Sequence, residues 1–81
     1  MTDVEYKSFY RTQRNLAIAI NQIVDDYWNE KMKEAEFIQC IRVIYANNTE
    51  KLVKNNQFTT VVQQQCGKRR LAVVEKILQI K

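Results

Sequence analysis

Three cations that follow the only glycine are the residues of this sequence whose types and spacing point most directly to a site. Gly67 is followed by Lys68, Arg69 and Arg70. If a helix begins after Gly67, these side chains lie on its first turn, where the helix dipole disfavours cations by roughly 0.3–1 kcal/mol each. Backbone amides at a helix start, flanked by cations, bind phosphate or carboxylate. The cluster therefore predicts an anion site. The alternative is a solvated turn whose charges pair with the protein's own acids.

A second group of cations lies near the N-terminus. Lys7, Arg11 and Arg14 are spaced four and three residues apart, which places them on one face of a helix. Nucleic-acid-binding domains combine such a stripe with a basic helix start. We therefore take these three residues, with the cluster at 68–70, as candidate nucleic-acid contacts. The alternative is an ordinary exposed helix face.

Charge is distributed unevenly along the chain. Five acidic residues gather around the first predicted turn between helices: Asp25, Asp26, Glu30, Glu34 and Glu36. Residues 39–81 carry eight cations and two acids. The acidic turn and the basic tail can pair within one molecule or between two. Either pairing would neutralise the cations that indicate nucleic acid.

Apolar side chains outside the main helical stripes are candidates for a protein contact. Ile18 and Val43 lie off these stripes, and several aromatic residues can be exposed. Surplus apolar surface on a small bundle indicates an interface. The candidate contact residues are Tyr6, Tyr10, Ile18, Trp28 and Val43, while Phe9, Tyr27, Phe37 and Phe58 are assigned to the core.

Catalysis and metal binding find little support in the residue types. The chain has no histidine to act as a base and no glycine-rich loop to hold phosphates. Its two cysteines, Cys40 and Cys66, cannot supply the four ligands of a zinc site. We expect no enzyme, no metal, no cofactor and no small-molecule substrate. Both thiols are expected to be reduced on buried helix faces; the alternative is one disulfide and an oxidising compartment.

The composition bounds the fold and the location. The chain has 81 residues, 46% of them hydrophobic and 27% charged, with one glycine and no proline. Folds built from many strands need turn residues that this chain lacks, so the prediction is a single all-α domain spanning residues 1–81. The longest apolar stretch, 16–20, is far shorter than the roughly 20 residues of a membrane span. The N-terminus has no signal-peptide pattern, so we expect a cytoplasmic protein without a membrane partner.

Periodicity predicts a bundle of four to five helices. A first helix is expected at about 4–29, opened by a Thr2-x-x-Glu5 capping box, and a second at about 33–47. A short helical turn is expected at 50–54. A further helix from Thr59 or Thr60 to about Cys66, with a capping box at Thr60-x-x-Gln63, and a last one at about 69–80 complete the set. Gly67 is expected to be a left-handed C-cap between them, the alternative being one continuous helix.

Five short segments carry a resemblance to known sequences. They are Phe9-Tyr10-Arg11-Thr12-Gln13, Asp25-Asp26-Tyr27-Trp28, Tyr45-x-Asn47-Asn48, Phe58-Thr59-Thr60-Val61 and Gly67-Lys68-Arg69-Arg70-Leu71. With them the chain resembles a family of short, uncharacterised bacterial proteins of about 80 residues. The resemblance implies a natural folded domain and no established activity.

Two functions of different classes follow. The first is a non-enzymatic regulatory or adaptor domain that binds another protein or a second copy through apolar helix faces. The alternative is a nucleic-acid-binding domain that uses Lys68, Arg69 and Arg70. A net charge of +4, with an acidic cluster present, is modest for a dedicated nucleic-acid binder. We therefore favour the protein-binding function.

Overall fold

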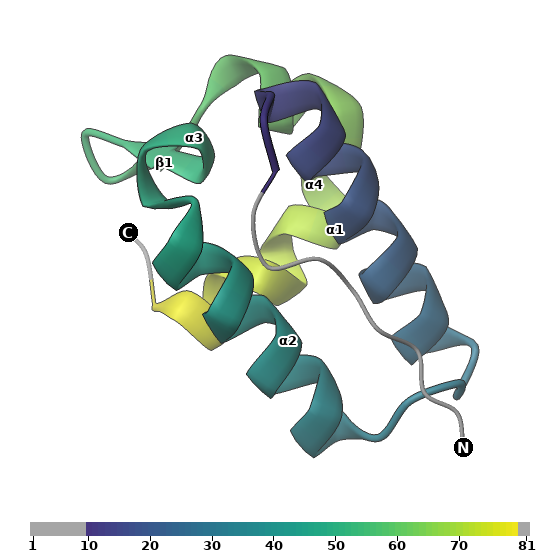
Figure 1. Ribbon diagram of the computed structural model, residues 1–81. Coiled ribbons are helices and arrows are strands. Elements are labelled where there is room, and N and C mark those ends of the chain that lie inside the picture. The colour runs from purple at the N-terminus through teal and green to yellow at the C-terminus, as the bar shows by residue number, and fades with distance from the viewer. Residues whose placement is uncertain (1–9, 80–81) are drawn as a thin grey trace.

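Four helices and one hairpin follow one another along residues 10–79, which are the residues that this computed structural model describes. The elements are α1 Gln13–Trp28, α2 Glu34–Asn47, α3 Thr49–Leu52, β1 Val53–Lys54, β2 Gln57–Phe58 and α4 Thr60–Leu78. Helices α1 and α2 run in opposite directions beside each other, and α4 lies behind them in Figure 1. The all-α prediction is confirmed, and the hairpin is an addition to it.

Helix α1 begins later than predicted. Thr12 is its N-cap, and the Thr12 hydroxyl accepts a hydrogen bond from the backbone N–H of Asn15 at 3.0 Å. Residues 10–12 are not helical, so a continuous helix over 4–29 is wrong. A side chain that caps the first turn fixes an extended conformation at its own residue, and this starts the helix there. The predicted capping box at Thr2 and Glu5 lies outside the described residues.

Helix α2 agrees closely with the predicted range. The carboxylate of Glu36 accepts a hydrogen bond from the N–H of Lys33 at 2.9 Å, which holds the chain where the helix begins. At the other end, the Asn48 side-chain amide donates to the carbonyl of Ile44 at 2.8 Å. Asn48 also accepts the backbone N–H of Tyr10 at 3.0 Å, so one buried asparagine ends α2 and holds the chain before α1.

The hairpin was not predicted. Asn55 and Asn56 have φ values of 55° and 64°, and two positive φ angles in a two-residue loop match the type I′ turn of a tight hairpin. Val53 pairs with Phe58, and Lys54 pairs with Gln57. The expected helical turn at 50–54 is confirmed only over α3, because the chain becomes extended at Val53.

One apolar core joins the helices. Its fully buried side chains include Leu16 and Ile20 from α1, Phe37 and Ile41 from α2, and Val74 from α4. The rings of Tyr27 and Phe37 stack with centroids 4.3 Å apart, so the ends of α1 and α2 are joined by an aromatic pair. Of the other predicted core aromatics, Phe58 packs against the core, and Phe9 lies outside the described residues.

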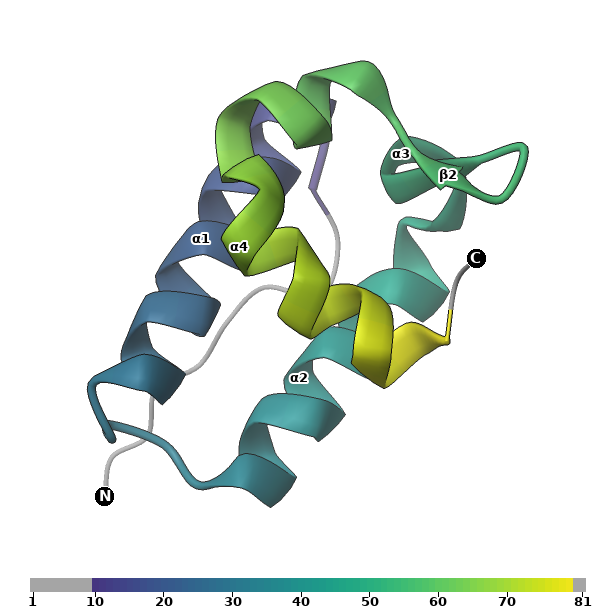
Figure 2. The same cartoon turned by 180° about the vertical axis from the view of Figure 1, so that it is seen from behind.

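Gly67 divides α4 into two straight pieces, 60–66 and 68–78. Its φ of 80° and ψ of 169° lie in a region that is essentially restricted to glycine. The predicted break is confirmed, but the predicted left-handed helical conformation is wrong because that conformation requires ψ near 47°. The Thr60–Gln63 capping box is also absent, since Thr59 is the N-cap and Gln63 bonds elsewhere. Figure 2 shows the first piece beside α1 and the second turning towards α2.

Candidate functional site

The Gly67 kink frees two carbonyl groups of α4, and side chains satisfy both. In an unbroken helix the carbonyls of Gln65 and Cys66 would accept from the backbone N–H groups four residues later. Here the Asn21 side-chain amide donates to the Gln65 carbonyl at 3.0 Å. The Arg70 guanidinium donates to the Cys66 carbonyl at 3.5 Å. The kink is therefore held by polar groups from α1 and from the next turn of α4.

Arg70 is paired with an acidic residue of α1. Its Nε and Nη2 atoms donate to the two carboxylate oxygens of Asp25, each at 3.0 Å. This hydrogen-bonded pair raises the pKa of Arg70. The sequence placed Arg70 in an anion site and gave pairing with the acidic turn as the alternative. For Arg70 the structure agrees with the alternative, because its guanidinium pairs with Asp25.

The other two cations of the cluster lie in different directions. The guanidinium carbon of Arg69 lies 5.8 Å from the ring centre of Trp28, which is a cation–π contact. Lys68 is exposed and lines a groove on the side of α4 that β2 faces. Lys68, Arg69 and Arg70 are thus neighbours in sequence that lie towards three different parts of the fold: the groove, Trp28 and Asp25.

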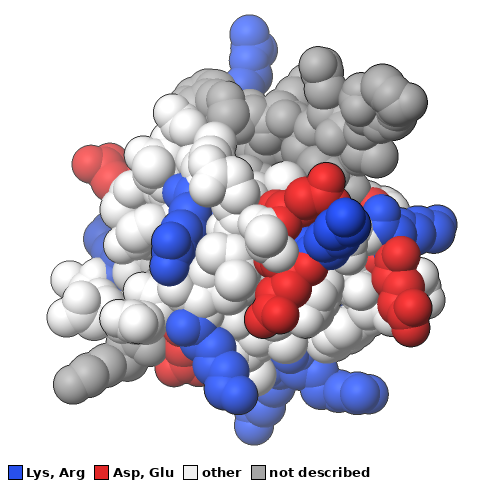
Figure 3. All heavy atoms as spheres, turned by 90° about the horizontal axis from the view of Figure 1, so that it is seen from below, with Lys and Arg blue, Asp and Glu red and all other residues white. Residues whose placement is uncertain are grey.

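The N-terminal cations lie apart from this cluster. Arg11 and Arg14 are exposed around the start of α1, and Lys7 lies outside the described residues. Arg14 precedes Asp25, the partner of Arg70, by about 16 Å of helix axis. Figure 3 views the molecule from below, at the end where α1 meets α2, and acidic and basic side chains are interspersed there.

The predicted protein-contact residues also differ in their exposure to solvent. Ile18 is 50% exposed and Trp28 is 43% exposed, and they are the large apolar side chains that α1 presents to solvent. Tyr10 was expected in an exposed patch, but it is partly buried against the core, because Asn48 holds its backbone there. Val43 is partly buried, and Tyr6 lies outside the described residues.

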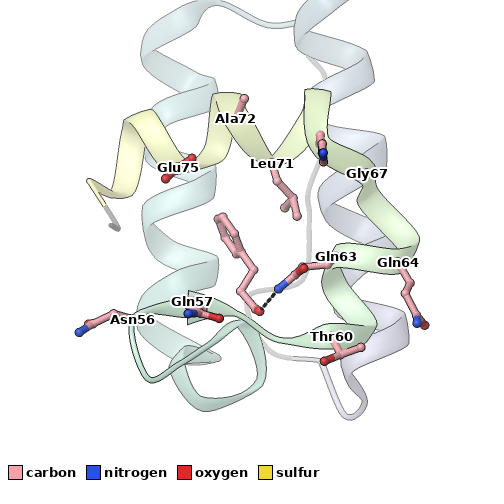
Figure 4. Close-up of a pocket in the computed structure, with 11 residues that line it drawn as sticks. Asn56, Gln57, Thr60, Gln63, Gln64, Gly67, Leu71, Ala72 and Glu75 are labelled. Atoms are coloured by element: carbon pink, nitrogen blue, oxygen red, sulfur yellow. Dashed lines mark hydrogen bonds between the residues drawn. The ribbon is translucent and has the colours of Figure 1, made fainter.

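A groove that the sequence did not indicate lies between the hairpin and α4. Its volume is about 740 Å³, and Phe58 and Leu71 are apolar side chains in its lining. The Gln63 side chain donates to the Phe58 carbonyl at 2.6 Å across its inner end (Figure 4). The groove exists because the hairpin and the kink bring 56–58 opposite 68–75. Neither feature leaves a periodic signal in the sequence.

The two thiols are held in their protonated form. Burial raises the pKa of Cys66 to about 11 and also raises the pKa of Cys40, with Glu36 adding to the second shift. The Cys66 thiol lies 3.5 Å from the Ala17 carbonyl, to which it donates. Both cysteines are free. Within residues 10–79 no three cysteine or acidic side chains gather where they could hold a metal ion.

The comparisons with known proteins give a family for the fold and site just described. A family model described as a conserved hypothetical protein matches residues 7–79. The chain belongs to this family. The match covers every described helix, the hairpin and the kink, so the groove and the Arg70–Asp25 pair lie within what the family model spans. No curated protein and no solved structure matches the chain. In the described residues, no helix combines the length and the apolar character needed to cross a bilayer.

Proposed function

We propose that this chain is a non-enzymatic protein-binding domain, and that it binds through the α1 contact surface, which we define as Ile18, Trp28 and Arg69. The observation that carries the proposal is the exposure of Ile18 and Trp28. They are the large apolar side chains exposed within residues 10–79, and both belong to α1. A small domain that leaves a tryptophan half exposed gains free energy by covering it.

The residue types of this surface match those of protein interfaces. Tryptophan and arginine are enriched at the centres of interfaces, where a few side chains supply most of the binding free energy. Arg69 lies over the Trp28 ring, so this pair is already ordered before a partner arrives. Burial of the exposed part of Trp28 would contribute roughly 2 kcal/mol.

The Asp25–Arg70 ion pair helps to hold together the two helices that carry the α1 contact surface. It joins α1 to the second piece of α4 through two hydrogen bonds of 3.0 Å. Because Arg69 is the neighbour of Arg70, this joint also holds Arg69 against Trp28. Ile18 and Trp28 are ten residues apart, which is about 15 Å of helix axis. A partner helix or a second copy can cover this length.

Nucleic acid remains the alternative partner, favoured by the exposure of Lys68, Arg69, Arg11 and Arg14. Two observations weigh against it. Asp25 pairs with Arg70, and Arg11 and Arg14 lie at the start of α1, whereas Asp25 lies near its end. Binding to phosphates requires several cations on one continuous surface.

We propose that the protein is bacterial and works in the cytoplasm. The two free cysteines support the location, because a reducing compartment keeps such thiols unpaired. The absence of histidine from the sequence supports a function without catalysis.

Site-specific photocrosslinking in cells of the source organism tests the proposal. A photoreactive amino acid at position 18 should give discrete protein adducts, and Trp28→Ala should abolish them. The same amino acid at position 39, exposed on α2, is the matched control and should give none. Adduct masses would distinguish a second copy from a foreign protein. Adducts that contain nucleic acid, or equal adducts at both positions, would contradict the proposal.

A further inference from the structure

The outer edge of β2 presents backbone groups that no strand of the hairpin uses. Thr59 donates its N–H to the Leu52 carbonyl at 3.0 Å, so that pair is hydrogen bonded. In an antiparallel ladder hydrogen-bonded and non-hydrogen-bonded pairs alternate. The pair between Val53 and Phe58 is therefore of the second kind. The N–H and carbonyl of Phe58 consequently point away from β1.

A side chain occupies part of the place where a further strand would lie. The Gln63 amide donates to the outward-pointing Phe58 carbonyl at 2.6 Å. This is the bond that the backbone N–H of an added strand would make. Gln63 is exposed and comes from the first piece of α4, so its side chain can rotate away without disturbing the core. The dashed line in Figure 4 marks this bond at the inner end of the groove.

The groove has the shape of an open channel beside this edge. In Figure 4 the segment from Asn56 to Thr60 forms one wall, and the second piece of α4 forms the opposite wall. The first piece of α4 closes one end. Leu71 points into the space between the walls, and with Phe58 it gives the groove an apolar interior. An extended chain with one apolar side chain fits such a channel.

Two opposite charges mark the ends of the α4 wall. Lys68 and Glu75 both line the groove, and both are exposed. They are seven residues apart, hence on one helix face and about 10 Å apart along the axis. An extended strand covers that distance in about three residues. Within residues 10–79 neither side chain forms an ion pair, so both charges can meet a ligand.

We propose that this groove binds an extended peptide segment of another protein, which adds as a third strand beside β2. The segment pairs with the backbone of Phe58 and places an apolar side chain on Leu71. It carries an acidic residue near Lys68 and a basic residue near Glu75, about three positions apart. This mode is known generally as strand addition, in which main-chain bonds give affinity and side-chain pockets give specificity. The site is distinct from the α1 contact surface and does not rest on it.

Selection from a phage-displayed library of random linear peptides on the full chain tests the proposal. Wild-type protein should enrich peptides with an acidic and a basic residue flanking an apolar one. The exchange variant Lys68→Glu/Glu75→Lys should enrich peptides with the opposite charge order. The control variant Lys31→Glu/Glu34→Lys makes the same exchange at the α1–α2 connection and should leave the selected peptides unchanged. Because all four positions are exposed, both variants should fold.

A synthetic peptide from the wild-type selection allows the effect to be measured. Its affinity should fall about tenfold for the exchange variant and stay constant for the control. In NMR titrations the backbone amide of Phe58 and the side-chain amide of Gln63 should shift, while Ile18 should not. No enrichment over background, equal affinity for both variants, or shifts confined to α1 would overturn the proposal. Enrichment that single-stranded oligonucleotides compete away would overturn it as well.

Discussion

The two faces of the Gly67 kink carry similar residue types and have different surroundings. On the face towards α1, the polar groups of α4 are bonded by Asn21 and Asp25. On the face towards the hairpin, Lys68 and Glu75 lie along an open groove. The first face uses its polar groups to hold the fold, and the second leaves the charges of Lys68 and Glu75 exposed. This difference separates charges that the sequence shows as one cluster.

The largest effect that bears on this comparison is expected for Gly67→Ala. The backbone conformation of Gly67 is strained for any other residue, so the free energy of unfolding should fall by about 1–3 kcal/mol. An added Cβ would meet nothing within 4 Å, so the effect is expected from the backbone alone. Urea unfolding measures it, with Gln64→Ala, an exposed neighbour in the same helix, as the control. An unchanged midpoint for Gly67→Ala would show that the kink is not fixed by glycine.

The next largest effect is expected at alkaline pH, where the Cys66 thiol, which donates to the Ala17 carbonyl of α1, loses its proton. Burial raises the pKa of Cys66 from 9.0 to about 11, so the folded state holds the thiol proton more tightly than the unfolded state. Stability is therefore full below pH 9 and decreases as the pH rises towards 11, by about 1–3 kcal/mol. Urea unfolding at several pH values measures the decrease, and Cys66→Val should reduce its slope. An identical slope in both proteins would contradict this role of the thiol.

A smaller effect is expected when a partner of the freed carbonyls is removed. Asn21→Ala takes away the hydrogen bond to Gln65 and should lower the free energy of unfolding by about 1 kcal/mol. The effect is limited because Asn21 Oδ1 is itself buried without a partner among the described residues. Gln63→Ala removes a comparable bond on the groove face, at an exposed position, and should change stability by less than about 0.5 kcal/mol. Equal destabilisation of the two variants would contradict the claim that hydrogen bonds on the α1 face stabilise the fold more than those on the groove face.

The smallest effect should come from Asp25→Asn. Its ion pair with Arg70 is about one-third exposed on both sides, so water screens it, and the expected loss is below about 1 kcal/mol. The same change should loosen Arg69 from Trp28, because Arg70 no longer anchors the second piece of α4. Fluorescence of Trp28, the sole tryptophan, should therefore change. Glu50→Gln, which removes one negative charge at an exposed position of α3, is the charge-matched control and should leave the spectrum as it is.

What the sequence could predict depended on local patterns. The spacing of apolar residues in 33–47 predicted both ends of α2 to within one residue, and the lone glycine predicted the position of the kink. Both follow from interactions between residues a few positions apart. A position off the helical stripes, which is again a local property, indicated Ile18 and Val43 as exposed; Ile18 is exposed, and Val43 is partly buried.

What the sequence could not predict depended on distant contacts. Arg70 and Asp25 are 45 residues apart, and nothing in their spacing indicates that they meet. The hairpin was missed because each strand has only two residues, too few to show alternation. The start of α1 was misplaced although its N-cap, Thr12, is a local feature, whereas the bond from the Tyr10 backbone to Asn48, the C-cap of α2, joins residues 38 positions apart. The groove depends on the hairpin and the kink together, so it required the fold.

Acrylamide quenching of Trp28 fluorescence tests the proposed α1 contact surface most directly, because the chain contains one tryptophan. The probe is the full chain, alone over a range of concentrations and with the protein that crosslinks to position 18. We expect the quenching constant to fall severalfold when a second copy or that partner covers the ring. A quenching constant that stays the same in the complex would contradict a protein contact at Trp28.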